Sequence, residues 1–431
     1  MQTNTQNKQI RITNILENIL LANKPSKTET SEVWAIVNEF ISKVKKRRKD
    51  LGIKVEIMLG GSVAKGTFLK DRFDSDVFFR FSRSYADDKL SDMLEKILQP
   101  FRRNNLTRIH GSRDYFQLEY KSVDFELVPV YKITDPSKAV NVTDASPLHV
   151  NWVKSQLIEK PDIRDDIILA KMFCKAQGIY GAESYIKGFS GHVLDVLVIH
   201  FGGFIKFLEN VSKWKANVKI DVMGHGVVLN QAKTCSPVIL IDPVQPERNA
   251  AAALSIEKYN RFKEAARGFL KAPSEEWFAK KKLSMDDLED KAGNNNLIII
   301  KVWPQEGKND IIGCKIMKSF DLIKKRFILN DFDVLESGWN WPLKKDALFW
   351  FIIKNEKLDR YKNWIGPPLS ATEHVSAFKR MHSSTFEEKG RICARIVRKF
   401  LKPEVLAEFV IKDDCVKQKV KRIKLKSVKL K

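Results

Sequence analysis

The sequence predicts an α+β multidomain protein with a mixed-sheet first domain, a helical central domain, a small β-α-β-β domain and a helical tail. Its 431 residues are long enough for about three domains. Short runs rich in Val, Ile and Phe dominate before residue 145, whereas helical periodicity dominates from 163 to 271. A strand, a helix and two strands follow, which is the order expected of a small sheet packed on helices.

In the first domain, a helix is predicted over Ser31–Leu51 because apolar side chains recur there on one helical face. Thr30 or Ser31 would cap its start, and Gly52 would end it. A second helix is predicted over Asp87–Arg103. The predicted strands of this domain are Ile53–Leu59, Val77–Phe81, Tyr115–Tyr120 and Val123–Val130.

The later elements set the remaining domain boundaries. Helices are predicted over 163–177, 191–213, 255–271 and 310–329, and residues 370–401 are predicted to be helical. Strands are predicted over 296–303, 331–339 and 346–353. The predicted domains therefore span 1–145, 146–272, 273–365 and 366–431.

The chain is strongly basic, with 76 Lys and Arg against 53 Asp and Glu and a formal charge of +23. Such a surplus predicts a polyanionic partner, either nucleic acid or an anionic membrane surface. The longest apolar stretch, Val193–Leu208, is interrupted by polar residues and falls short of the ~20 apolar residues of a membrane span. Five cysteines without a Cys-x-x-Cys pair, and a start without the apolar core of a signal peptide, predict a cytoplasmic protein with reduced thiols.

The last fifteen residues, Lys417–Lys431, contain eight Lys or Arg and no acidic residue. Two structures fit this segment: a mobile basic arm, or an edge strand whose lysines discourage pairing with other sheets. A membrane-surface protein held by this segment is an alternative that rests on the segment alone.

A glycine-rich segment, Gly60-Gly61-Ser62, follows the first predicted strand. Glycines let the backbone approach a ligand closely, and Ser62 offers a hydroxyl and an N–H near the start of a short helix, which is a natural seat for phosphate. Lys65 can add a cation. A P-loop is excluded, because its lysine follows the second glycine, and here Lys65 precedes Gly66.

Carboxylates follow on two predicted strands. Asp74 and Asp76 open one strand, and a period of two places both on the same face. Asp124 and Glu126 share a face on another strand. Hard oxygen ligands select Mg²⁺, and three carboxylates from neighbouring strands could hold two Mg²⁺ ions that activate a hydroxyl and stabilise leaving pyrophosphate.

The strand, the Gly-Gly-Ser segment, the 12 residues from Ser62 to Asp74 and the Asp-x-Asp strand together resemble the nucleotidyltransferase superfamily. That superfamily includes poly(A) polymerases, DNA polymerase β and the tRNA CCA-adding enzymes. Further stretches resemble the archaeal-type (class I) CCA-adding enzymes in order and spacing, over roughly residues 30–410. They are Ser146–His149, Lys171, Ile179–Glu183, Lys187–Gly191, Ile241–Val244, Arg248-Asn249, Gly366–Pro368 and His374-Val375.

The resemblance implies a polymerase β-like catalytic head, a nucleotide-binding neck, an α/β body and a tRNA-binding tail in the four predicted domains. It implies a template-independent enzyme that uses Mg²⁺ to add C, C and A to the 3′ end of tRNA from CTP and ATP. The body and tail would grip the acceptor stem and elbow through shape and phosphates. Family members are commonly dimers, so a homodimer is the implied state.

The resemblance also implies roles for particular residues. Asp74, Asp76 and Glu126 would be the catalytic metal ligands, with Asp124 as the alternative to Glu126. The implied nucleotide-binding residues are Gly61, Ser62, Lys65, His149, Lys171, Tyr180 and Arg248.

Most of these nucleotide-binding residues have more specific implied tasks. Ser62 and Lys65 would contact the triphosphate, and Tyr180 would either pack on the ribose or donate a hydrogen bond. Lys171 and His149 would meet the triphosphate, and Arg248 would help to read the base edge. Lys65 stands where the family usually has Arg, which keeps the charge but loses the bidentate fork.

Two other functions remain open on the sequence alone. One is a poly(A) polymerase or another nucleotidyltransferase, which would differ in its use of CTP. The other is a non-catalytic RNA-binding protein on the same scaffold, which the retained carboxylates disfavour.

Overall fold

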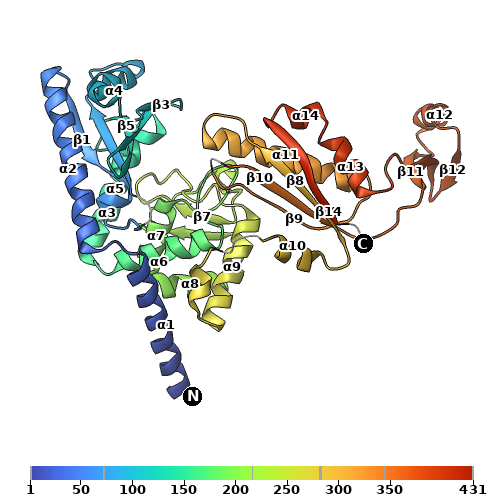
Figure 1. Cartoon of the computed structure of the whole chain (residues 1–431), viewed down its shortest axis with the longest axis horizontal. Coiled ribbons are helices and arrows are strands. Elements are labelled where there is room, and N and C mark those ends of the chain that lie inside the picture. The colour runs from blue at the N-terminus through green and yellow to red at the C-terminus, as the bar shows by residue number, and fades with distance from the viewer. Residues whose placement is uncertain (1, 71–72, 216, 281–283, 344, 430–431) are drawn as a thin grey trace. The chain divides into compact units, whose positions relative to one another are not determined.

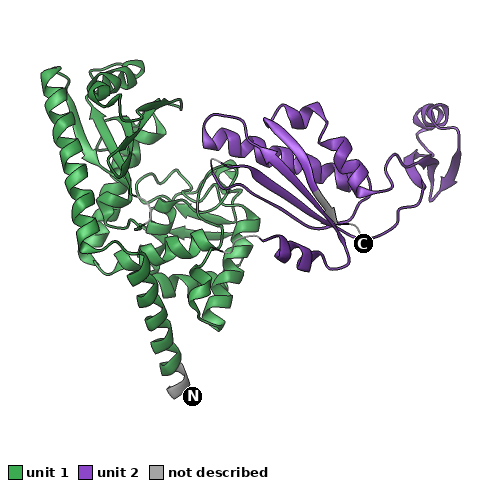
Figure 2. Ribbon diagram, viewed as in Figure 1, with its two compact units in different colours: residues 1–281 green, residues 282–431 purple. Residues whose placement is uncertain are grey.

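The computed structural model describes residues 2–70, 73–215, 217–280, 284–343 and 345–429. These residues form two compact units, Met1–Lys281 and Lys282–Lys431 (Figure 2). The α+β architecture is as the sequence predicts.

The first unit contains a five-stranded mixed sheet in the order β1-β2-β5-β4-β3 (Figure 1). Its strands are β1 (Val55–Leu59), β2 (Asp74–Phe81), β3 (Thr107–Ile109), β4 (Tyr115–Tyr120) and β5 (Val123–Tyr131). Only β2 and β5 pair in parallel among these described strands. Helices α2 (Lys27–Asp50) and α4 (Leu90–Leu98) pack on one face, where Phe40 and Leu94 join a buried aromatic and aliphatic core.

Helix α2 confirms the first predicted helix but begins before the predicted start. Its N-cap is Ser26, whose hydroxyl accepts a hydrogen bond from the Glu29 N–H at 3.1 Å. The Glu29 carboxylate accepts one from the Ser26 N–H at 2.8 Å. The helix therefore begins after Ser26 and not after Thr30 or Ser31, because this capping box satisfies two free amide groups at once.

The rest of the first unit is mainly helical. Its other elements are α1 (Gln2–Asn23), α3 (Gly61–Lys65), α5 (Ser146–Glu159), α6 (Ile163–Ala176), α7 (Gly191–Phe201), α8 (Phe204–Lys213), α9 (Ile256–Lys271), β6 (Val218–Asp221) and β7 (Val238–Ile241). Sequence analysis did not predict α1, although its Ile12, Ile15 and Ile19 are buried at helical spacing.

The prediction of one helix over 191–213 is wrong. Gly202 ends α7 in a left-handed conformation, with φ of +73°, and Gly203 has φ of +124°. Backbone conformations of this kind favour glycine and stop a helix. Helices α7 and α8 are consequently bent by 93°.

No single described helix is long and apolar enough to cross a membrane, and α7 with α8 meets that test only as a bent pair, by length and composition.

The second unit contains the predicted β-α-β-β arrangement. Its four-stranded antiparallel sheet has the order β14-β8-β10-β9, with α11 (Asn309–Leu329) and α13 (Pro403–Val410) packed on one face (Figure 1). The strands are β8 (Asn296–Trp303), β9 (Val334–Asn340), β10 (Ala347–Ile353) and β14 (Arg422–Lys429). Two shorter helices are α10 (Met285–Ala292) and α14 (Asp414–Lys417).

The predicted helical tail is wrong beyond residue 381. After α12 (Thr372–Met381), the chain forms a hairpin of β12 (Thr385–Glu388) and β13 (Arg391–Val397), which pairs with β11 (Tyr361–Pro368). The turn is Lys389-Gly390, with φ of +49° and +73°. Two consecutive positive φ angles suit a two-residue hairpin turn and exclude a continuous helix.

Two structures were considered for the basic tail, a mobile arm and an edge strand, and the tail forms the edge strand. β14 pairs antiparallel with β8, and Val420, just before it, is buried. Ile423 and Leu425 pack against the core of the second unit, while Lys424 and Lys426 are exposed. The described part of this segment is therefore not a mobile arm.

We expect that ending the chain after Lys421 exposes one edge of β8 and removes the packing of Ile423 and Leu425. Hydrogen exchange of the β8 amides that face β14 should then become faster. A matched K424Q/K426Q variant keeps the strand and should keep the protection. Equal protection in the truncated chain would contradict a structural role for β14.

Candidate active site

The predicted metal-binding carboxylates lie on β2 and β5. The parallel register sets Asp74 beside Asp124 and Asp76 beside Glu126. Because side chains alternate along a strand, all four carboxylates project from one face of the sheet. Helices α2 and α4 cover the other face of the sheet. Ala64 of α3 and helix α5 pack on the face that carries the carboxylates. The register accommodates either Glu126 or Asp124 as the third ligand.

The Gly-Gly-Ser segment closes over Asp76. The Gly60 N–H donates to the Asp76 carbonyl at 2.7 Å. Gly61 has φ of +63°, and a β-carbon there would lie 2.5 Å from the Asp76 carboxylate. Only glycine therefore lets the backbone approach this carboxylate so closely. Ser62 is the second residue of α3 and is half-buried.

The donor chemistry of these carboxylates fits a divalent cation. Burial raises the pKa of the Asp76 carboxyl to about 6. The positive charge of Lys65 opposes this shift, and the negative charge of Asp74 contributes to it. A buried carboxylate that resists ionisation beside another carboxylate is stabilised by a cation placed between them. Oxygen donors of this kind suit Mg²⁺.

A buried aspartate, Asp195, brings two predicted nucleotide-binding lysines together. Lys65 Nζ pairs with one Asp195 oxygen, and Lys171 Nζ lies 2.9 Å from the other. Lys171 also donates to the Thr67 hydroxyl at 3.0 Å. Two lysines share a single carboxylate, which leaves a net positive charge in the cluster.

This cluster shifts the protonation equilibria of its members. Burial lowers the pKa of the Lys171 ammonium to about 8, although the charge of Asp195 opposes the shift. Burial would raise the pKa of Asp195, but the charges of Lys171 and Lys65 hold it below its ordinary value. Asp195 therefore remains ionised although its side chain is fully buried.

Tyr180 completes this side of the site. A β-carbon on Gly191 would lie 3.0 Å from the Tyr180 hydroxyl and 3.8 Å from Lys171 Cε. Burial raises the pKa of the hydroxyl, and the charges of Asp195 and Asp74 raise it further. Tyr180 is thus a neutral donor close to both the lysine cluster and the carboxylates.

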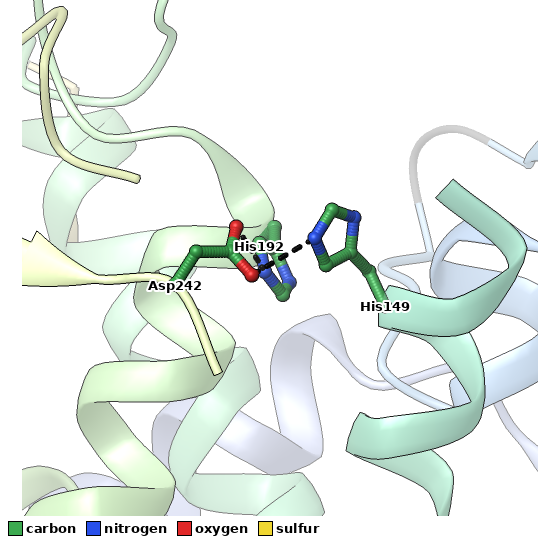
Figure 3. A group of neighbouring side chains, drawn as sticks. All are labelled: His149, His192 and Asp242. Carbon is green, nitrogen blue, oxygen red and sulfur yellow. Dashed lines mark hydrogen bonds and ion pairs between the residues drawn. The ribbon is translucent and has the colours of Figure 1, made fainter. Parts of the chain in front are cut away.

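A second buried aspartate, Asp242, contacts two other predicted residues, His149 and Arg248. Figure 3 shows Asp242 with His149 and His192. The Asp242 Oδ1 lies 3.0 Å from His149 Nε2, and the Oδ2 lies 3.2 Å from an Arg248 nitrogen. His192 Nε2 lies 3.8 Å from Oδ2, and the two histidine rings are 4.5 Å apart. The backbone N–H of Val244 donates to Oδ1 at 2.9 Å.

His149, His192 and Asp242 offer three ligand atoms within 4.8 Å of one another. Among the described residues, this group has the spacing of a single-ion site, whereas the predicted carboxylates do not. The Arg248 guanidinium already occupies one Asp242 oxygen, however, and His149 with a backbone amide occupies the other. We therefore interpret the group as a hydrogen-bonded cluster that positions His149 and Arg248.

The pKa shifts agree with that interpretation. Burial, and after it the charge of His149, lowers the pKa of His192 to about 3, so His192 is neutral. Burial opposes ionisation of Asp242, but the hydrogen bond and charge of His149 hold its pKa at about 2.

Sequence analysis did not identify Asp195, Asp242 or His192 as site residues. Asp195 was noted only as a residue that interrupts the apolar stretch Val193–Leu208. Asp242 was noted only as part of Ile241–Val244, one of the stretches on which the family resemblance rests. A signal existed for Asp195, because an aspartate inside an apolar helix needs a buried partner.

Three family models match consecutive parts of the chain. A nucleotidyltransferase domain matches residues 41–149, the second domain of tRNA nucleotidyltransferase matches 165–279, and the C-terminal domain of the CCA-adding enzyme matches 297–424.

Archaeal proteins are similar over most of the chain. The CCA-adding enzyme of Nanoarchaeum equitans is 32% identical over 353 residues, which cover 80% of this chain and 84% of that protein. The CCA-adding enzyme of Methanocaldococcus jannaschii is 29% identical, with coverage of 91% and 89%. The solved structure of Cid1 poly(U) polymerase with Mg and 3′-dATP has a TM-score of 0.51 at 13% identity, covering 63% of this chain and 99% of that chain, and shows likeness of fold only.

We expect D195N to reduce the free energy of unfolding by about 3–5 kcal/mol, because it leaves two buried ammonium groups without their counter-charge. Denaturant titration measures this loss. D165N is the matched control, since its ion pair with Lys24 is exposed and should contribute at most about 1 kcal/mol. A D195N loss no larger than that of D165N would contradict the assigned ion pairs.

Asp76 should make the metal-free protein less stable as pH rises. Its folded pKa of about 6 exceeds the ordinary 3.8, so the folded state binds the proton more tightly and stability falls between about pH 4 and 6. In EDTA, D76N should therefore be more stable than the parent by about 2–3 kcal/mol at pH 7, with the difference vanishing near pH 4. A difference independent of pH would contradict the raised pKa.

Proposed function

This chain belongs to the CCA-adding enzyme family of tRNA nucleotidyltransferases, and from that membership we infer that it completes the CCA end of tRNA by nucleotidyl transfer. It is an enzyme whose substrates are RNA and nucleoside triphosphates, and family membership implies use of a divalent metal. The observation that carries the proposal is the register of β2 and β5, which aligns four carboxylates beside the Gly60-Gly61 turn.

We propose CTP and ATP as the nucleotides, with two Mg²⁺ ions. Asp74, Asp76 and Glu126 would hold the metal, with Asp124 as the alternative to Glu126. Metal bound there supplies activation of the attacking hydroxyl and charge stabilisation of the leaving pyrophosphate. The tRNA 3′ oxygen bonds to the α-phosphorus as the bond from the α-phosphorus to the bridging oxygen of pyrophosphate breaks.

The protein groups around the carboxylates fit the binding of a triphosphate. The Lys65 and Lys171 ammonium groups carry the net positive charge of the Asp195 cluster, which suits a polyphosphate. Gly61 and Ser62 would offer backbone and hydroxyl groups to the same phosphates, and Tyr180 would donate from its neutral hydroxyl.

The Asp242 cluster would contact both the phosphates and the base of the nucleotide. It orients His149, which we propose as a phosphate contact, and Arg248, whose side chain is 44% exposed. A guanidinium held at one end by a carboxylate still has free N–H donors for the base edge. We propose that this guanidinium, together with backbone groups and the RNA end, accepts cytosine and adenine, which share an exocyclic amine next to a ring nitrogen.

The remaining predictions concern organisation and partners. We propose the four-part division into head (1–145), neck (146–272), body (273–365) and tail (366–431), in which α13 and β14 of the tail complete the sheet and core of the body. Body and tail would grip the acceptor stem and elbow of tRNA. A homodimer is our proposal from the family. The five free cysteines accord with a reducing cytoplasm.

We expect the enzyme to add C from CTP alone to tRNA that lacks all three terminal nucleotides, and then A when ATP is supplied. Product lengths on sequencing gels measure both steps. Gly61→Ala, which forces a β-carbon against Asp76, and Asp76→Ala should each lower kcat at least 100-fold, whereas Gly52→Ala, with open space around it, should not. A poly(A) polymerase would ignore CTP, and a non-catalytic RNA-binding protein would be unaffected by Asp76→Ala, so either outcome would contradict the proposal.

A further inference from the structure

A cationic hollow lies at the end of the first sheet remote from the carboxylates. It has a volume of about 770 Å³, and its lining includes Lys45, Arg48, Lys54, Arg80, Arg83 and Lys132 against one acidic residue, Glu56. These cations come from α2, the segment before β1, β2 and the segments that follow β2 and β5. Six cations from separate parts of the chain therefore converge where one carboxylate is present.

The strand directions place this hollow away from the chemistry. Asp76 is near the start of β2 and Arg80 near its end, about 13 Å further along at the usual rise of a strand. β1 runs antiparallel to β2 and pairs Glu56 with Arg80, while Lys132 follows the end of β5. The hollow is therefore separate from the nucleotide site.

The internal ion pairs leave most of this charge unneutralised. Glu56 is shared by Arg80, at 2.9 Å, and Lys132, at 2.8 Å. Arg48 and Arg83 donate to backbone carbonyls of Val55 and Lys138.

Lys45, Lys54 and Arg83 are exposed, and no described carboxylate pairs with any of the three. The dipole at the end of α2 accounts for cations in that helix alone, not for those on the strands.

We propose that this cationic hollow binds the phosphate backbone of RNA, through charge and without reading bases. A fixed group of Lys and Arg is the usual complement of successive phosphates, and arginine suits them through its forked donors. The inference rests on the proposed function only for the choice of tRNA as the probe. Lys54, just before the edge strand β1, and the other cations near this edge could instead serve only to discourage pairing between sheets, and that role would leave RNA affinity unchanged.

The test is a triple variant, K45Q/K54Q/R83Q, in the full chain. Its affinity for tRNA lacking CCA is measured by fluorescence anisotropy over a series of salt concentrations. We expect affinity to fall about tenfold or more at 50 mM salt, and the slope of log affinity against log salt to become shallower by about 2–3, because three phosphate contacts are lost.

The matched control is K96Q/R102Q/R103Q, which removes the same charge from exposed positions on α4 and just after it. Its slope should change by less than about 1. Addition of C at saturating tRNA should remain within twofold of the parent for both variants, which separates this inference from the proposed function. Equal losses in the two variants, or unchanged affinity in K45Q/K54Q/R83Q, would overturn the proposal.

Discussion

The ion pairs of Asp195 with Lys65 and Lys171 hold the candidate site together. They join α3, which follows the first strand of the sheet, to α6 and α7 of the helical part. Asp195 is fully buried, so its charge persists only because two ammonium groups face it. The same contacts place positive charge beside the Asp76 carboxylate. Structural cohesion and the electrostatics of the site therefore depend on one interaction.

Helix α7 links the two halves of the site. His192 and Asp195 are three residues apart on it, and three residues is the spacing at which helical side chains are neighbours. The charges of Asp195 and Lys65 act on His192, which itself faces Asp242. One helix therefore connects the lysine cluster around Asp195 with the histidine cluster around Asp242.

Local pattern was sufficient for four of the five strands of the first sheet and for its carboxylates, whereas β3 was not predicted. Alternation predicted that Asp74 and Asp76 share a face. Gly60 and Gly61 were predicted to let the backbone approach a ligand closely, and in the structure Gly61 lies against the Asp76 carboxylate. Local pattern failed where one or two residues changed the backbone direction. Gly202-Gly203 broke a long apolar helix, and Lys389-Gly390 turned a predicted helix into a hairpin. In both cases positive φ angles outweighed hydrophobic periodicity.

The sequence by itself determined the α+β class, the residue types of the site and the order in which they occur, because these follow from short-range periodicity and from motifs. Tertiary structure alone decided which distant side chains meet. Asp195 lies 130 residues beyond Lys65, and Asp242 lies 93 beyond His149. It also decided that the basic tail is an edge strand, since β14 needs β8 as its partner. Buried charges must find counter-charges, and only the folded chain shows where those are.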